Sequence, residues 1–202
     1  MRSKMIPTSQ VTPFAARDWP ERHRWTGSQF DRACKSGIFD GKRIELINGE
    51  ILERPVPDDS HAQAIQLSHY ALLDFFPPTR ATISIQCPMR LGDSRPVPSL
   101  AVIEGTPRQI VQHPTTALLV IEISNTTIHF NRIDKARLYA AHGISDYWII
   151  NVNGKCVEVR RSPIGAEVGD PQYGELRVYS AAQALSPLAA PQAVLKVSDL
   201  LP

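Results

Sequence analysis

The stretch LVIEISNTTIHFNRIDKARLYAAHGISDYWIINV, residues 119–152, decides the fold. It begins inside an almost wholly apolar run, 117–124, which is typical of a strand buried on both faces of a sheet. The next residues predict a helix over about 132–142, with Gly143 as its C-terminal cap. The run 146–152 then predicts another strand. This order indicates a mixed α/β fold, in which helices pack on a mixed sheet.

Two β-hairpins are predicted on either side of this stretch. Asn48-Gly49 separates the runs 42–47 and 50–55. This dipeptide favours a type I′ turn, because both central residues of that turn need a positive φ. Asn153-Gly154 similarly precedes the run 156–161 and predicts a second hairpin.

Two further helices and three further strands complete the predicted architecture. Thr26 and Ser60 are each followed three residues later by a glutamine, which is the capping-box spacing of a helix start. Pro77-Pro78 ends the second of these helices. The remaining strands are expected over 81–88, over 97–103 and near 175–179.

Length and composition set the expected domain organisation. The 202 residues are 43% hydrophobic and 21% charged, which is ordinary globular usage and excludes a disordered or fibrous chain. We expect a flexible basic N-terminal arm over 1–24 and a single domain over 25–202. An Ala- and Pro-rich tail, 181–202, is expected to wrap the body of that domain.

Charge, hydropathy and cysteine usage exclude several function classes. A net charge of +2 indicates neither a nucleic acid nor a membrane as partner, and no apolar run approaches the roughly 20 residues of a membrane span. The three cysteines form no CxxC pair, so we expect reduced thiols in a cytoplasmic protein. HExxH, P-loop and Gly-x-Ser-x-Gly patterns are absent from the sequence, so zinc hydrolase, P-loop and serine hydrolase chemistry are not indicated.

Three side chains are candidates for chemistry. Glu122 ends the most apolar strand, where it is either a metal ligand or general base, or an acid that reaches solvent or an arginine. Lys135 shares a predicted helix face with Tyr139 and leans toward the sheet, unless it only covers apolar surface with its stem. Glu45 lies on the strand face opposite to its apolar neighbours, where the alternative is an exposed acid.

A family resemblance is carried by ELINGE (45–50), VPSLAVI (97–103) and the stretch 119–152. These segments resemble the Uma-two family of putative restriction endonucleases, within the PD-(D/E)XK nuclease superfamily. The resemblance covers roughly 25–201, and SIQCPMRL (84–91) also looks like the strand before the family's Pro-Asp motif. It implies a restriction-endonuclease-like core, in which a mixed β-sheet is flanked by helices, with N-terminal and C-terminal β-hairpins.

The resemblance implies a DNA endonuclease that hydrolyses phosphodiester bonds with Mg²⁺ or Mn²⁺. Carboxylates bind such a hard cation, which lowers the pKa of a bound water, and a lysine offsets the developing charge. By resemblance, Glu122 is a metal ligand and Glu45 is the acid of the first hairpin. Lys135 is the catalytic lysine, supplied by the helix because Ser124 stands at the usual lysine position.

Three residues depart from the family pattern. Its Pro-Asp motif reads Pro98-Ser99 here, so a neutral serine stands at the principal metal-ligand position. Asn125 and Asn131 also stand where the family usually has Asp. All three changes remove negative charge, and Mg²⁺ affinity should fall with it. Glu45, Glu104 or Asp134 could compensate, and nothing in the sequence selects among them.

Three hypotheses therefore stand. The chain is an active endonuclease with an altered site, or a catalytically inactive nuclease-fold protein that binds nucleic acid or a protein partner without a metal cofactor. The third hypothesis is a purely structural domain. Arg132, Lys135 and Arg137 are the candidate nucleic-acid-binding residues, because only Asp134 opposes them on their helix. A homodimer is expected by analogy, since cutting both DNA strands usually needs two sites, and no membrane partner is expected.

Overall fold

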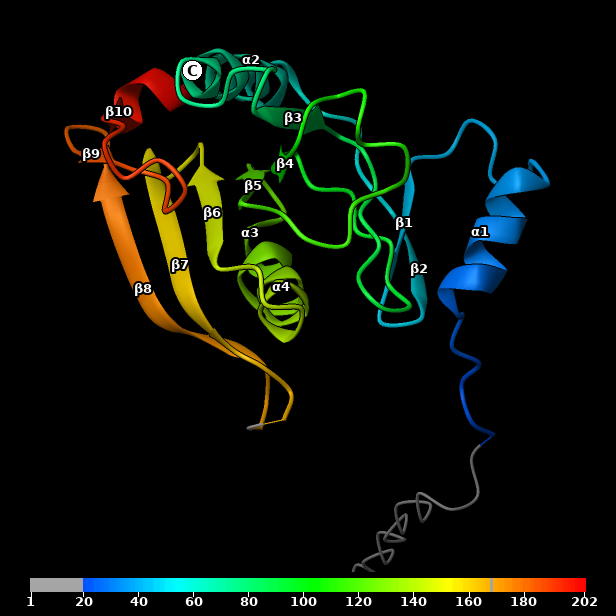
Figure 1. Cartoon of the computed structure of the whole chain (residues 1–202). Helices are drawn as coiled ribbons and strands as arrows, with labels where there is room; N and C mark the ends of the chain where they lie inside the picture. The colour runs from blue at the N-terminus through cyan, green and yellow to red at the C-terminus, as the bar shows by residue number, and fades with distance from the viewer. Residues whose placement is uncertain (1–19, 168) are drawn as a thin grey trace, which may run out of the picture.

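A six-stranded mixed sheet forms the centre of the computed structural model, which describes residues 20–167 and 169–202 (Figure 1). Its strands, in spatial order, are β3 (Ala81–Ile85), β4 (Leu100–Glu104), β5 (Leu119–Ser124), β6 (Asp146–Asn151), β7 (Cys156–Ile164) and β8 (Gln172–Ser180). Neighbouring strands are antiparallel except for β5 and β6, which are parallel. The predicted mixed sheet flanked by helices is confirmed.

The remaining elements surround this sheet. They are α1 (Gly27–Lys35), β1 (Ile44–Ile47), β2 (Glu50–Glu53), α2 (Asp59–Leu73), α3 (Ile128–Phe130), the π-helical segment η1 (Asn131–Lys135), α4 (Ala136–Ala141), β9 (Ala184–Leu185), β10 (Leu195–Lys196) and the 3-10 helix η2 (Val197–Leu200). Strands β1 and β2 pair as a separate hairpin, and β9 pairs with β10. No helix within the described ranges has the length and apolarity to cross a membrane. Most of the expected basic arm, 1–24, lies outside the described residues.

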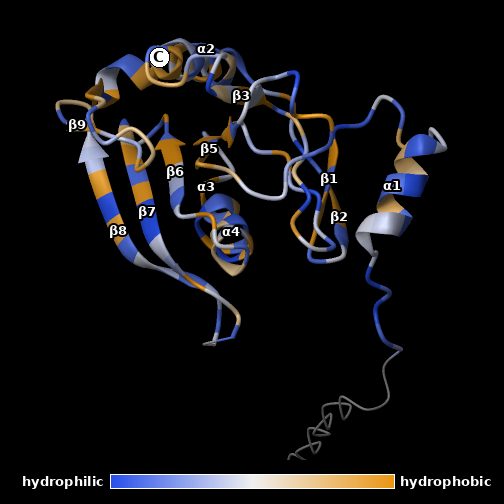
Figure 2. Cartoon of the chain, viewed as in Figure 1, coloured by the Kyte–Doolittle hydropathy of each residue, from blue (hydrophilic) through white to orange (hydrophobic). Residues whose placement is uncertain are grey.

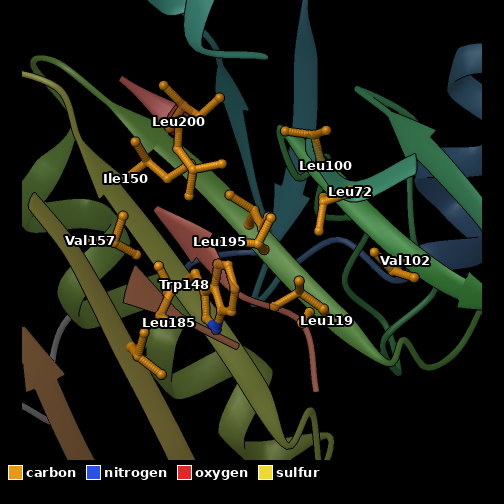
Figure 3. Close-up of a cluster of buried hydrophobic side chains, with 14 of the residues drawn as sticks. Leu72, Leu100, Val102, Leu119, Trp148, Ile150, Val157, Leu185, Leu195 and Leu200 are labelled. Carbon is orange, nitrogen blue, oxygen red and sulfur yellow. The ribbon is translucent and has the colours of Figure 1, made fainter. Parts of the chain in front are cut away.

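Both faces of the central strands are buried, and each face has its own core. Alternate residues of β5 and β6 pack against α2 and the C-terminal segment, including Trp148 and Ile150, which Figure 3 shows together with Leu185, Leu195 and Leu200. The intervening residues of the same strands pack against α4. This double burial explains why β5 is almost continuously apolar. Farther out, β7 and β8 show alternating hydrophobic and hydrophilic bands (Figure 2), because successive side chains of a strand point to opposite faces of the sheet.

The helix starts follow local capping chemistry, with one correction. Thr26 and Gln29 form the predicted capping box of α1, with bonds of 2.8 and 3.2 Å between side chains and backbone amides. The second helix begins near Ser60 as predicted, at Asp59, but the predicted capping box of Ser60 and Gln63 is wrong. Asp58 is the N-cap instead, and its carboxylate accepts the backbone N–H of His61 at 2.8 Å. Aspartate and serine are about equally favourable at the N-cap position. The three-residue spacing from Ser60 to Gln63 therefore did not determine which residue caps α2.

Three strand boundaries and one turn also differ from the prediction. β3 ends at Ile85 because Gln86 adopts a φ of 49°, and β4 begins only at Leu100. β8 is longer than expected because it pairs with β7 along its whole length. Asn48 and Gly49 have the positive φ values of a type I′ turn. In the second hairpin the positive φ falls on Lys155, outside the Asn-Gly pair.

Candidate active site

Glu122 is the centre of a buried polar cluster on the α4 side of β5. The residue is 5% exposed, and both of its carboxylate oxygens accept hydrogen bonds. Oε1 accepts from the Lys135 Nζ at 3.1 Å and from the Tyr139 hydroxyl at 2.8 Å. Oε2 accepts from the backbone N–H and the hydroxyl of Ser99, at 3.3 and 3.4 Å. The acid therefore reaches neither solvent nor an arginine.

Lys135 lies between two carboxylates. Its Nζ is 2.6 Å from Oε2 of Glu45 and 3.1 Å from Oε1 of Glu122, and the side chain is 2% exposed. Burial alone would lower the pKa of Lys135, but the charges of Glu122 and Glu45 outweigh it and raise that pKa above its usual range. Lys135 is therefore a buried, charged ammonium group. It is not a surface lysine whose stem only covers apolar residues. We call Glu45, Glu122 and Lys135 the acid–lysine cluster.

The first hairpin delivers Glu45 to this cluster. The backbones of Leu46 and Arg95 exchange two hydrogen bonds, of 2.7 and 3.3 Å, which join β1 to the loop before β4. The N–H of Val97, in that loop, donates to Oε2 of Glu45 at 3.0 Å. Glu45 is 3% exposed, so the alternative of an exposed strand acid does not hold. The hairpin, joined to this loop, therefore brings Glu45 to the lysine that Glu122 of β5 also contacts.

Ser99, which the resemblance places at the position of the family's aspartate, links the segment before β4 to β5. Its Oγ accepts the backbone N–H of Ile123 at 3.0 Å and donates toward Glu122 at 3.4 Å. The hydroxyl thus supports the Glu122 carboxylate without adding charge to it. The acid–lysine cluster holds two carboxylates and one ammonium, where an aspartate at position 99 would add a third carboxylate.

Tyr139 belongs to the site, although the sequence assigned it no role. It is fully buried, and burial followed by the charge of Glu122 raises the pKa of Tyr139 well above its usual value. The hydroxyl therefore keeps its proton and donates a hydrogen bond to Glu122. The available signal was its position four residues after Lys135, on the same helix face. The preceding π-helical segment η1 ends at Lys135, and such segments are frequent at functional sites.

The two amides at positions where the resemblance leads us to expect acids both line the cavity beside the cluster. Asn125 donates from Nδ2 to both oxygens of Asp58 and to the hydroxyl of Ser60, each at 2.8 Å. Its Oδ1 is buried and has no hydrogen-bond partner in the described part of the chain. Hydrogen bonds from His61, Asn125 and Ser60 hold the pKa of Asp58 below its ordinary value. An acid on α2 thus faces position 125, and Asn131 is buried close to the cluster.

A cavity of about 310 Å³ opens onto these groups. Its lining comes from the β1–β2 hairpin, the start of α2, the segment before β4, the end of β5, and the segment α3–η1. The polar lining residues are Arg43, Glu45, Glu53, Arg54, Asp58, His61, Gln86, Ser99, Glu122, Asn125, Thr126, Thr127, Asn131 and Lys135. A volume of this size lies at the lower end of the range for small-ligand sites.

The other predicted residues lie away from the cavity. Arg132 forms an ion pair with Glu158 of β7. Two of its guanidinium nitrogens donate to Oε1 of Glu158, Nε at 3.0 Å and Nη2 at 2.5 Å. Arg137 is exposed and does not line the cavity. Glu104 is exposed at the end of β4 remote from Ser99, and Asp134 is also exposed. Of the three acids that could compensate for Ser99, the structure brings Glu45 to the cluster.

The oxygen atoms that could coordinate a metal ion are of the kind that suits a divalent cation, but few of them carry negative charge. No group of three or more His, Cys, Asp and Glu side chains suited to a metal converges within residues 20–167 and 169–202. The available donors are the carboxylates of Glu122 and Glu45, the hydroxyl of Ser99 and the unpartnered Oδ1 of Asn125. These are hard oxygens of the kind that Mg²⁺ and Mn²⁺ accept. The donor types therefore suit a divalent cation, while the cluster supplies only two carboxylates to hold one.

Comparisons with known proteins agree with the family that the sequence resembles. The Uma2 family model, described as "Putative restriction endonuclease", matches residues 28–198. Among solved structures, the chain is similar to the crystal structure of a putative nuclease belonging to DUF820 from Anabaena variabilis ATCC 29413. The identity is 21%, the match covers 87% of this chain and 97% of that chain, and the TM-score is 0.64, which shows a shared fold. No curated protein matches the chain.

Proposed function

Since this chain belongs to the Uma2 family of putative restriction endonucleases, we propose that it is a metal-dependent DNA endonuclease with an altered active site. The observation that carries the proposal is the Lys135 ammonium, held between the carboxylates of Glu45 and Glu122 beside an open cavity. A buried acid–lysine–acid arrangement is costly to assemble, which supports a functional role for it.

The chain's own residues have distinct roles in this proposal. Glu122, Ser99 and Asn125 would hold Mg²⁺ or Mn²⁺, which lowers the pKa of a bound water and stabilises charge on the phosphate when present. Lys135 orients the attacking water and offsets negative charge that develops on the phosphate. Glu45 keeps Lys135 charged and directed at the cavity. Tyr139 fixes the Glu122 carboxylate in one orientation, so the site is preorganised.

Nicking of supercoiled plasmid with Mg²⁺ or Mn²⁺ tests this proposal. We expect Glu122→Gln and Lys135→Met each to lower the nicking rate by about a hundredfold or more, the usual effect of removing one such group. Glu104→Gln is the matched control, because this acid is exposed on the neighbouring strand outside the cavity. Wild-type nicking rates in both cluster variants would show that the assignment is wrong.

A second function is favoured by the serine at position 99. With a neutral group there, and no converging group of three acids or other metal ligands among the described residues, the chain could bind DNA or a protein partner without cutting DNA. This alternative predicts no nicking with any divalent ion, and only weak Mg²⁺ binding by calorimetry. Tight Mg²⁺ binding by the wild-type protein would exclude it.

We further propose that the protein works as a cytoplasmic homodimer on duplex DNA. β8 is the outermost strand of the sheet, and it exposes Leu176 and Val178 beside an edge that no other described strand covers. Pairing of two such edges would place two acid–lysine clusters in one particle. Light scattering combined with size-exclusion chromatography distinguishes this dimer from a monomer.

A further inference from the structure

Two arginines face each other across the first hairpin, on the face that lines the cavity. The backbone N–H of Arg54 donates to the carbonyl of Arg43 at 2.6 Å, one position beyond the last residue pair of the two strands, Ile44 with Glu53. In this register Arg43 is on the same strand face as Glu45, and Arg54 lies opposite Arg43. Both line the cavity. Like charges directly opposite each other destabilise a hairpin, so this pair needs an explanation.

No carboxylate in the described part of the chain forms an ion pair with either guanidinium. Arg43 donates to two neutral acceptors, the carbonyl of Pro55 at 3.1 Å and Oε1 of Gln86 at 3.3 Å. The side chain of Arg54 makes no hydrogen bond or ion pair within the described ranges, and its Nε is buried. Burial followed by the charge of Arg54 lowers the pKa of Arg43, which is the effect of two close cations.

The acids of the cavity are engaged by other groups. Glu53 faces Lys42 at 3.8 Å, and the two carboxylates of the acid–lysine cluster share Lys135. Asp58 accepts hydrogen bonds from the start of α2 and from Asn125. The two arginines therefore present unneutralised positive charge to the cavity, where an anion from outside the chain can meet it.

The backbone is strained where it positions one of these arginines. Gln86 adopts a φ of 49°, a conformation that non-glycine residues rarely take, and its side chain accepts from Arg43. Such strain is concentrated at binding sites, where the surrounding structure maintains it. His61 lines the same cavity from the first turn of α2 and adds a ring that hydrogen-bonds to anions.

We propose that Arg43, Arg54 and His61 form a phosphate subsite that binds a phosphate group of the nucleic acid next to the one at the acid–lysine cluster. That the phosphate belongs to a nucleic acid rests on the function proposed above. Guanidinium groups match phosphate oxygens with two parallel hydrogen bonds, which fixes the strand in register with Lys135. Both a backbone phosphate and a terminal 5′-phosphate have this chemistry.

Binding without cleavage tests the subsite. A fluorescent duplex oligonucleotide is titrated in EDTA at several salt concentrations, with and without a 5′-phosphate, and inorganic phosphate is added as competitor. We expect Arg43→Gln and Arg54→Gln each to weaken binding by about tenfold and to reduce the salt-dependence slope by roughly one. Arg108→Gln, an exposed arginine outside the cavity, is the matched control and should bind as the wild type does.

Arg54→Gln also separates a binding role from a structural one. Because its side chain has no polar partner among the described residues and faces Arg43, the substitution should leave the melting temperature unchanged or raise it while binding falls. Equal loss of affinity for both oligonucleotides assigns the subsite to a backbone phosphate, and a loss confined to the phosphorylated one assigns it to a 5′-phosphate. Wild-type affinity and slope in both variants, or no salt-dependent binding by the wild type, would overturn the proposal.

The failure of this inference differs from the failure of the proposed function. If the arginine variants lose binding while the wild type never nicks DNA with a divalent ion, the subsite stands and the endonuclease proposal fails. If the wild type nicks DNA and both variants bind and nick equally well, the endonuclease proposal stands and the subsite fails.

Discussion

The Nζ of Lys135 lies 2.6 Å from a carboxylate oxygen of Glu45, a residue 90 positions earlier in the chain. Both side chains are almost fully buried, so neither charge is screened by water. With Glu122 as the second acid, the lysine joins the hairpin β1–β2 to the central sheet. The fold thus depends on the same three charges to which the proposed chemistry is assigned.

Removal of the lysine should destabilise the fold strongly. Lys135→Met leaves two buried carboxylates without their cation, and we expect the free energy of unfolding to fall by about 3–5 kcal/mol. Urea denaturation measures this loss. The triple variant Glu45→Gln, Lys135→Met, Glu122→Gln should regain much of the stability, because it removes all three charges together. Unchanged stability of Lys135→Met would contradict the buried ion pairs.

The Tyr139 hydroxyl should matter for both stability and nicking. Tyr139→Phe removes the 2.8 Å hydrogen bond to Glu122, so we expect a loss of about 1–3 kcal/mol in unfolding free energy and on the order of tenfold in nicking rate. Tyr173→Phe is the control, because its hydroxyl donates to the Ile144 carbonyl at 2.8 Å, away from the cluster. The role is refuted if the two variants nick DNA at the same rate.

Much of this site follows from local sequence patterns. Glu122 and Lys135 are 13 residues apart on a strand and a helix whose patterns are plain, so their approach could be predicted. Glu45 was also a candidate from strand alternation, but only the family resemblance gave it a role at the site. Strand alternation places it on the correct face, yet cannot say what that face meets.

Contacts between distant segments could not be predicted from the sequence. Asn125 donates to Asp58, 67 residues away, and the Ser99 hydroxyl, directly before β4, hydrogen-bonds to Glu122 and Ile123 of β5. Both depend on how α2 and two strands pack, which no spacing rule encodes. The π-helical segment η1 was likewise missed, because its residues continue an ordinary helical pattern into α4. The arginine pair follows from hairpin register, but its lack of acid partners appears only in three dimensions.

An ion pair away from the cavity should make stability depend on acid pH. Asp31 accepts two hydrogen bonds of 3.0 Å from Arg95, which lower the pKa of Asp31 below its ordinary value of 3.8 despite partial burial. A carboxyl with a lowered folded-state pKa adds stability above its unfolded pKa, and that stability is lost as the pH falls through the folded value. We expect Asp31→Asn to cost about 1–3 kcal/mol at neutral pH.

The difference between wild type and Asp31→Asn should shrink as the pH falls below 3.8. Urea titrations at about pH 7, pH 4 and pH 3 measure this trend, since the wild-type carboxyl then becomes protonated and resembles the amide. A difference that stays constant over this range would show that the charge of Asp31 contributes nothing to the pairing with Arg95.

Ser99→Asp is the variant that tests the altered site itself. The new carboxylate would stand beside Glu122, whose Oε2 is 3.4 Å from the serine hydroxyl. Two buried like charges repel each other, so we expect a lower melting temperature in EDTA. A divalent cation between them should reverse this effect, since ligand that binds only the folded state adds stability in proportion to the logarithm of its concentration over Kd. Mg²⁺ should therefore raise the melting temperature of Ser99→Asp more than that of the wild type, and calorimetry should show tighter binding.

Ser99→Asn has the same size without the charge and should show no such gain. If Mg²⁺ shifts all three proteins equally, position 99 is not a ligand position and the serine is no reason for weak metal binding.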